Sequence, residues 1–142
     1  MSFDLKISGG DLVIDTDADL ATVENSEKLI QDVLKMLMTP IGSNQWYPWF
    51  GSPLAGSMIG SPFDSNFISS IAENQIRSSL ETVQSLQKEQ ATKQIVSPSE
   101  LLAAIKSINV VRNQIDPTFF SINLSLLTKN LTIVNTSFNV TL

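Results

Sequence analysis

The spacing between apolar residues changes twice along this 142-residue chain, and the change limits the folds open to it. Apolar and polar residues alternate from Phe3 to Ile7 and again in the last segment, Leu131 to Leu142, and a period of two predicts strands. Between them, stripes with a period near 3.6 predict amphipathic helices. This order indicates an α+β fold with one domain over residues 1–142: an antiparallel sheet, built from the N- and C-terminal strands, packs against two or three helices. A boundary near Gln90–Val96 is the one alternative to a single domain.

Turn signals divide the two strand regions into hairpins. Gly9-Gly10 predicts a tight turn after the first strand, followed by a strand at Leu12–Ile14 and a short third strand at Leu20–Val23. Lys129-Asn130 predicts the turn between a strand at 120–126 and the last strand. One face of the last strand, interrupted by a polar Thr136, carries Val134, Phe138, Val140 and Leu142.

A first helix is predicted after residue 24. Asn25 or Ser26 is its expected N-cap, Glu27 suits its first turn, and Pro40 and Gly42 end it. Its apolar residues form a single stripe: Leu29, Ile30, Val33, Leu34 and Leu37.

Two further helix starts share the pattern Ser-Pro followed by an acidic residue. Ser61-Pro62-Phe63-Asp64 predicts a helix that runs to about Lys88, with Gln84–Gln94 as its exposed end or a linker. Ser97-Pro98-Ser99-Glu100 predicts a short third helix that ends near Ile108.

Composition excludes several classes of function. The net charge is −5 and the nine basic residues are scattered, which argues against a nucleic-acid partner because phosphate neutralisation needs clustered cations. The sequence has no Cys, and therefore no disulfide. No apolar run reaches the roughly 18 residues of a membrane-spanning helix or marks a signal peptide, so we expect no membrane partner and assembly in a cytosol. Only 16% of the residues are charged, which suits a surface covered by protein partners.

Catalytic and metal-binding patterns are incomplete. The absence of His and Cys removes His-based triads and thiolate sites. A calcium loop that starts at Asp15 would need Gly and Glu where Leu20 and Ser26 stand. The densest acidic group lies in a turn-rich segment with nothing apolar nearby to raise a pKa: Asp11, Asp15, Asp17 and Asp19. We expect no catalytic residue, no metal ion and no cofactor.

Two segments are candidates for a partner interface. The stretch from Ile41 to Gly60 is rich in Gly, Pro and Ser and carries four aromatic residues. They could close the edge of the core as a plug, form a binding hot spot, or do both. The last strand is expected at a sheet edge, where a neighbouring subunit's strand could pair with it. The candidate interface residues are Trp46, Tyr47, Trp49, Val134, Phe138, Val140 and Leu142.

One motif resembles a known family. Leu34-x2-Leu37-Met38-Thr39-Pro40-Ile41-Gly42, followed by Pro48-Trp49-Phe50-Gly51-Ser52-Pro53-Leu54, is similar to the gene-25-type baseplate wedge and sheath-initiator proteins of contractile phage tails, a family also called tail lysozyme-like. The order of strands and helices is similar as well. In that family the motif shapes a loop between two helices, which here implies a loop-shaping role for Thr39, Pro40, Gly42, Pro48, Phe50, Gly51 and Leu54.

The resemblance implies a structural component of the virion tail baseplate, assembled in the host cytoplasm. Its implied partners are other baseplate wedge proteins and the tail sheath protein, with the tail tube or hub as a further candidate. The terminal strands would initiate the sheath. Two family features are missing: Ser43-Asn44 replaces a common Glu-Arg pair, and no Trp-Glu-Pro-Arg-Ile run follows the second helix.

Two alternatives stay open at this stage. A peptidoglycan-cleaving tail lysozyme would need two carboxyl groups on opposite sides of one glycosidic bond, and the sequence shows no such pair. A type VI secretion baseplate subunit would keep the structural role but belong to another contractile machine, which the loop motif does not distinguish from a phage tail.

Overall fold

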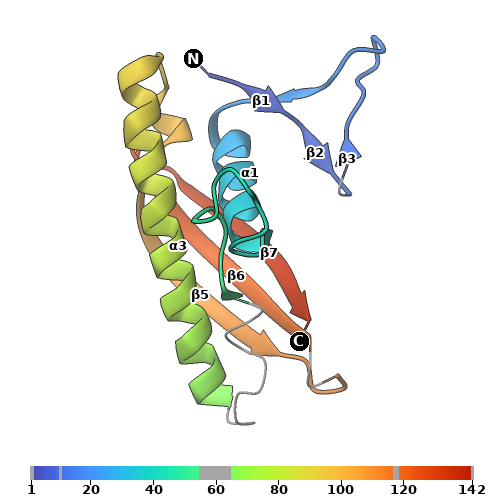
Figure 1. Ribbon diagram of the computed structural model, residues 1–142, viewed down its shortest axis with the longest axis vertical. Helices are drawn as coiled ribbons and strands as arrows, with labels where there is room; N and C mark the ends of the chain where they lie inside the picture. Colours follow the sequence, from blue (N-terminus) through green and yellow to red (C-terminus); the bar gives the residue numbers. More distant parts are fainter. Residues whose placement is uncertain (1, 10, 55–64, 117–118, 142) are drawn as a thin grey trace.

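A three-stranded sheet and two helices form the two layers of the fold (Figure 1). The computed structural model describes residues 2–9, 11–54, 65–116 and 119–141. Both helices lie on one face of the sheet, which confirms the α+β class. The helices are α1 (Asn25–Met38) and α3 (Ser65–Lys93), and the antiparallel strands, in spatial order, are β5 (Leu102–Arg112), β6 (Phe119–Thr128) and β7 (Ile133–Thr141).

The core lies between the helices and the apolar face of the sheet. The central strand β6 contributes four apolar side chains that are at most 2% exposed: Phe120, Ile122, Leu124 and Leu126. Facing them from the helices are Leu29, Val33, Met36, Leu37, Ile68, Ala72, Ile76, Leu80 and Val83. The predicted apolar face of β7 is confirmed: Val134 and Phe138 are buried and Val140 is half-buried, whereas Leu142 lies outside the described residues.

The N-terminal strands form a separate arm and do not join this sheet, contrary to the prediction of one shared sheet (Figure 1). β1 (Asp4–Leu5) pairs with β4 (Thr22–Val23), and β2 (Ile7–Ser8) pairs with β3 (Asp11–Leu12) across the predicted turn at Gly9. The reason is a side chain of α1 that takes the place of a strand.

Gln31 on α1 occupies the hydrogen-bonding positions that a neighbouring strand would fill. Its amide oxygen accepts the N–H of Ile7 at 2.9 Å, and its amide nitrogen donates to the carbonyl of Leu5 at 2.8 Å. Lys35 also pairs with Asp4. The arm therefore docks on a helix, and the sheet keeps only its C-terminal strands.

The start of α1 differs from the prediction. Glu24, in an extended conformation, precedes the helix without a side-chain cap, so neither Asn25 nor Ser26 is the N-cap. Asn25 has a positive φ of 54°, and its side-chain oxygen accepts the hydroxyl groups of Ser97 and Ser99, each at 3.0 Å. A tertiary contact has replaced the local cap. Glu27 lies in the first turn and Pro40 follows the end of the helix, as predicted.

Helix α3 extends beyond its predicted end at Lys88. Its predicted start at Ser61–Asp64 lies outside the described residues. The segment expected as an exposed end or linker is helical up to Lys93, and two of its Gln side chains point inward. Gln84 donates to the carbonyl of Ala103 at 3.0 Å, and Gln87 is 5% exposed and bonds the start of β5.

The predicted third helix is wrong. Ser97 and Glu100 form the expected capping box, but only one 3-10 turn follows, η1 (Pro98–Glu100), before β5 begins. The apolar residues Leu102, Ile105 and Ile108 have the spacing of a helix face. In the structure they share the inner face of β5 because the β5–β6 register shifts between Leu102 and Ala104 and again between Ile105 and Ser107. Each register shift inserts one extra residue, so the spacing between successive inward-facing side chains increases from two residues to three.

Glu100 links three parts of the chain at the top of the sheet. It is 1% exposed, and its carboxylate accepts the N–H and the hydroxyl of Ser97, each at 2.7 Å, and the hydroxyl of Ser2. Its backbone carbonyl accepts the amide of Gln87 at 3.0 Å. Burial by itself raises the pKa of Glu100, but the hydrogen bonds from Ser2 and Ser97 outweigh burial and hold the pKa below its ordinary value.

We expect Glu100→Gln to lower the free energy of unfolding at pH 7 by about 1–3 kcal/mol, because an amide cannot accept all of these hydrogen bonds. The folded-state pKa is depressed, so the contribution of the carboxylate is complete above its ordinary pKa of 4.5 and is lost as pH falls through the lower folded-state pKa. Urea unfolding at pH 7 and pH 3 measures this. The stability gap between the two proteins should narrow at pH 3. The exposed Glu81→Gln is the matched control, and an equal loss there would contradict the role of Glu100.

Candidate functional site

The described residues contain no cluster of three or more Asp or Glu side chains placed to hold a metal ion. The acidic segment after β3 is a local turn, in which the Asp15 carboxylate accepts the N–H groups of Asp17 at 2.9 Å and Asp19 at 3.2 Å. Among the described helices, none is long and apolar enough to cross a membrane.

Asp4 and Asp32 are the two carboxylates that share a cavity, and the sequence patterns did not single them out. The cavity, about 420 Å³, lies between the arm, α1 and α3. Burial raises the pKa of Asp32, although Lys28 donates a hydrogen bond to it at 2.9 Å. Burial also acts to raise the pKa of Asp4, but the hydrogen bond and charge of Lys35, with hydrogen bonds from Leu5 and Gln31, outweigh it and lower that pKa. Each carboxylate is thus already neutralised by its own lysine.

The loop after α1 is closed at its base by backbone hydrogen bonds. Thr39 caps the helix, because its N–H and its hydroxyl both donate to the carbonyl of Lys35. The carbonyl of Thr39 then accepts the N–H of Ser52 at 2.9 Å, and the N–H of Gly42 reaches the carbonyl of Pro48 at 3.1 Å. The two ends of the loop therefore lie side by side, and we call residues 39–42, 48 and 50–52 the neck.

Gly51 makes the close approach at the neck possible. Its φ is +118°, and a Cβ atom at this position would lie 2.5 Å from the carbonyl oxygen of Thr39. Its N–H donates to the sulfur of the buried Met36 at 3.3 Å. Just beyond the neck, Leu54 is 2% exposed and belongs to the core, and Phe50 packs against it. All seven residues of the loop motif thus lie in the neck or anchor it.

The aromatic side chains at the tip of the loop point to solvent. Trp46 is 86% exposed, Tyr47 56% and Trp49 48%. The rings of Tyr47 and Trp49 meet edge to face with centroids 5.8 Å apart, and Asn44 accepts the N–H groups of Trp46 and Tyr47. Interpreting the loop as a plug is therefore wrong for these three residues. We call them the aromatic tip.

Strand β7 is an edge strand with an unbroken register. It pairs with β6 from Ile133 to Thr141, and in the described part of the chain no strand pairs with its other edge. The hairpin bond from Thr128 N–H to the carbonyl of Thr132 fixes which residues bond inward. Since antiparallel pairs alternate, the N–H and C=O groups of Asn135, Ser137 and Asn139 point away from β6.

The opposite edge of the sheet, β5, is less suited to pairing. Its register is interrupted twice, and such irregularities disrupt the ladder. Gln84 of α3 already occupies the carbonyls of Leu102 and Ala103. Natural proteins protect edges with bulges, charges and Pro, yet the segment from Leu131 to Leu142 contains no charged residue and no Pro. β7 is the open edge.

The predicted interface residues divide between the two features. Trp46, Tyr47 and Trp49 form the aromatic tip, whereas the side chains of Val134 and Phe138 are buried in the core. The edge of β7 therefore offers a partner its backbone and not those side chains.

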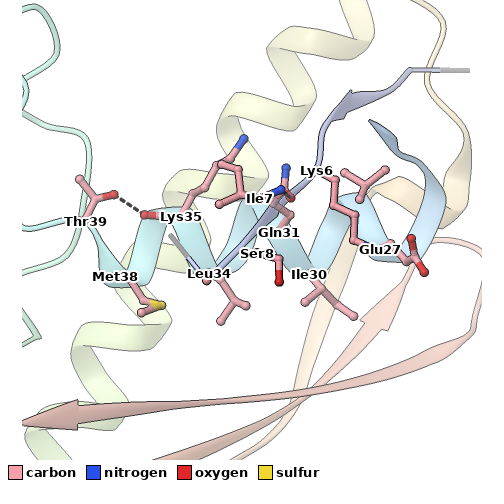
Figure 2. A pocket seen from close by; sticks show the side chains of 12 residues that line it. Lys6, Ile7, Ser8, Glu27, Ile30, Gln31, Leu34, Lys35, Met38 and Thr39 are labelled. Carbon is pink, nitrogen blue, oxygen red and sulfur yellow. Dashed lines mark hydrogen bonds between the residues drawn. The ribbon is translucent and has the colours of Figure 1, made fainter. Parts of the chain in front are cut away.

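A groove on the outer side of α1 was not foreseen. Figure 2 shows Ile30, Leu34 and Met38 projecting from one side of α1, and the arm residues Lys6, Ile7 and Ser8 line the same groove. The groove has a volume of about 720 Å³, and its apolar lining comes from Ile7, Val23, Ile30, Leu34 and Met38. Of the predicted stripe, Leu29, Val33 and Leu37 are buried in the core and Leu34 packs against it. Ile30 is half-buried and lines the groove.

Comparison with known proteins identifies a family and a structural neighbour. A family model described as contractile injection system sheath initiator matches residues 1–97, which include the arm, the loop and both helices. A crystal structure from Geobacter sulfurreducens, of a protein proposed to be a tail lysozyme, superposes with a TM-score of 0.61 over 82% of this chain and 89% of its own. At 14% identity this likeness shows the fold alone. No curated protein matches the chain by sequence.

We expect Gly51→Ala to lower the free energy of unfolding by about 2 kcal/mol or more, because it combines left-handed backbone strain with a collision at the Thr39 carbonyl. Gly42→Ala is the matched control: Gly42 has a φ of +84° in the same neck but open space around its Cβ position. Gly42→Ala should lower the free energy of unfolding by about 1–2 kcal/mol, because only backbone strain is added there. Chemical denaturation measures both, and equal losses would contradict the close approach at Gly51.

Proposed function

Because the chain belongs to the sheath initiator family of contractile injection systems, we propose that it is a non-catalytic baseplate component on which the tail sheath begins to assemble. The observation that carries the proposal is the open edge of β7. The first sheath subunit would add a strand there, and the machine would be a phage tail assembled in the host cytoplasm. A type VI secretion baseplate would use the same surface.

The chemistry of β7 suits strand addition. Its outward N–H and C=O groups form a ready row of donors and acceptors, and added main-chain hydrogen bonds supply affinity in complexes of this kind. The strand is held rigidly by β6 and by the burial of Val134 and Phe138. A partner therefore meets an ordered template and need not order it on binding.

The aromatic tip is the proposed contact with neighbouring baseplate wedge proteins. Exposed Trp and Tyr side chains are typical of interface hot spots. No charged residue occurs between Thr39 and Phe63, so the tip enters an apolar pocket without a desolvated charge. The neck fixes the direction in which the tip points.

A lysozyme activity is the weaker reading of this fold. It would rest on Asp4 and Asp32, which share a cavity and have pKa values shifted in opposite directions, as in acid–base pairs. Both carboxylates are committed to lysines of α1, which leaves neither free to donate a proton or attack a sugar. Clearing of peptidoglycan by the purified chain, lost in Asp32→Asn, would overturn the non-catalytic proposal.

We expect Ser137→Pro to fold but to abolish sheath assembly. Proline removes the outward N–H of Ser137 and leaves the bonds to β6 intact, and edge strands tolerate proline. Ser137→Ala keeps this N–H and should support normal assembly. Electron microscopy of particles from a strain that lacks the gene, complemented by each variant, measures the fraction of sheathed tails. Deleting the whole strand is a poorer test, because it also removes the buried Val134 and Phe138. Normal tails from Ser137→Pro would contradict the role of β7.

We expect Trp46→Ala to weaken binding to a baseplate wedge protein by about 2 kcal/mol or more, the usual loss at a hot spot. Because Trp46 is 86% exposed, stability should change by less than about 0.5 kcal/mol. Titration calorimetry with purified wedge proteins measures the affinity, and the adjacent exposed Gln45→Ala is the control. Equal affinities for the two variants would remove the aromatic tip from the interface.

A further inference from the structure

Helix α1 has two apolar faces, and in the described part of the chain one is buried while the other is only partly covered, with Leu34 touching the core. Leu29, Val33, Met36 and Leu37 are at most 3% exposed and face α3 and the sheet. Ile30 and Leu34 are half-buried, and Met38 is 61% exposed. These three residues, at i, i+4 and i+8, form a second stripe along the groove, and we call it the outer stripe.

The outer stripe lies beside the open edge of the sheet. α1 packs on β7, and the two run in a similar direction (Figure 1). Figure 2 shows the outer stripe projecting from α1 toward the side on which β7 passes. A strand added to β7 would lie about 4.8 Å beyond it. The added strand would extend the sheet by one strand beneath the outer stripe.

We propose that the groove receives the side chains of the sheath strand added to β7, and thereby selects a strand with apolar residues at every second position. This inference rests on the proposed function of β7. The groove and the edge of β7 together form one binding surface. The backbone of β7 binds the backbone of the incoming strand, and the outer stripe contacts its apolar side chains.

The spacing of the two elements matches. Residues at i and i+4 of a helix are about 6 Å apart along the axis. Side chains on one face of a strand are about 6.6–6.8 Å apart. The three residues of the outer stripe can thus face three successive inward residues of a strand, which gives a segment of at least five residues.

The polar surroundings restrict the remaining positions of that segment. On the outer face of the sheet, beside the incoming strand, stand the uncharged Asn135, Ser137 and Asn139, all exposed. The charged residues that line the groove are Lys6, Glu27 and Lys35, and Lys35 is paired with Asp4. The sheath strand should therefore alternate apolar residues with uncharged polar ones.

Charged substitutions in the outer stripe test this inference in the full-length chain. The probe is the purified sheath protein of the same contractile system, and its Kd is measured by biolayer interferometry. Met38→Glu should raise Kd at least tenfold, because it places a charge where an apolar side chain must be buried. Its exposure lets the variant fold. Ile95→Glu makes the same change at a residue that is 83% exposed outside the groove, and should bind normally.

The variant Ser137→Pro separates the two ideas. If it loses sheath binding while Met38→Glu and Leu34→Glu bind as tightly as the native chain, the groove is not the receptor and the inference fails, although β7 keeps its role. If Ser137→Pro binds normally, the proposed function fails and the inference with it.

A thiol footprint gives an independent readout, since the native chain has no Cys. A Met38→Cys variant should be alkylated rapidly alone and at least tenfold more slowly with sheath protein bound, whereas Ile95→Cys should stay reactive in both. Unchanged reactivity at position 38 overturns the inference. Protection that grows with the concentration of the chain alone overturns it too, because a second copy would then be the occupant.

Discussion

The inward face of β6 is the interaction on which the rest of the structure depends. Phe120, Ile122, Leu124 and Leu126 meet both helices, and β6 is the one strand of its sheet with a partner on each side. Burying a side chain of this kind contributes about 1.5–3 kcal/mol. With this apolar face buried in the core, the described part of the chain still exposes the edge of β7, the aromatic tip and the outer side of α1 to other molecules.

Those remaining surfaces differ in chemistry. The edge of β7 offers backbone groups, the aromatic tip offers large rings, and the groove offers aliphatic side chains. Each is held by a rigid support: β6 behind β7, the neck behind the tip, and the core-facing side of α1 behind the groove. A part that joins several neighbours in a large assembly needs such separate, ordered contacts, because each one avoids the cost of ordering on binding.

Local patterns predicted what depends on local chemistry. The fold class, the hairpin turns at Gly9 and Lys129, and the buried face of β7 all follow from spacing and turn residues. The errors arose where a distant group replaced a local one. Gln31 stands in for a strand, and the hydroxyls of Ser97 and Ser99 hold Asn25. The prediction of a third helix was wrong because two register shifts in β5 give its inward-facing residues the spacing of a helix face. The sequence did not predict whether the aromatic tip is exposed, because aromatic residues are as suitable for a core as for an interface.

The neck also determines where a pull on the aromatic tip would go. Gly51 is bonded to the sulfur of Met36, whose side chain is 1% exposed in the core, and Thr39 is bonded to the last turn of α1. A force applied at Trp46 is therefore transmitted through the neck to α1. Because α1 packs on β7, the force also reaches the sheet. In a machine whose sheath shortens suddenly, this short path would let the subunit carry mechanical load between its neighbours as a stiff coupling.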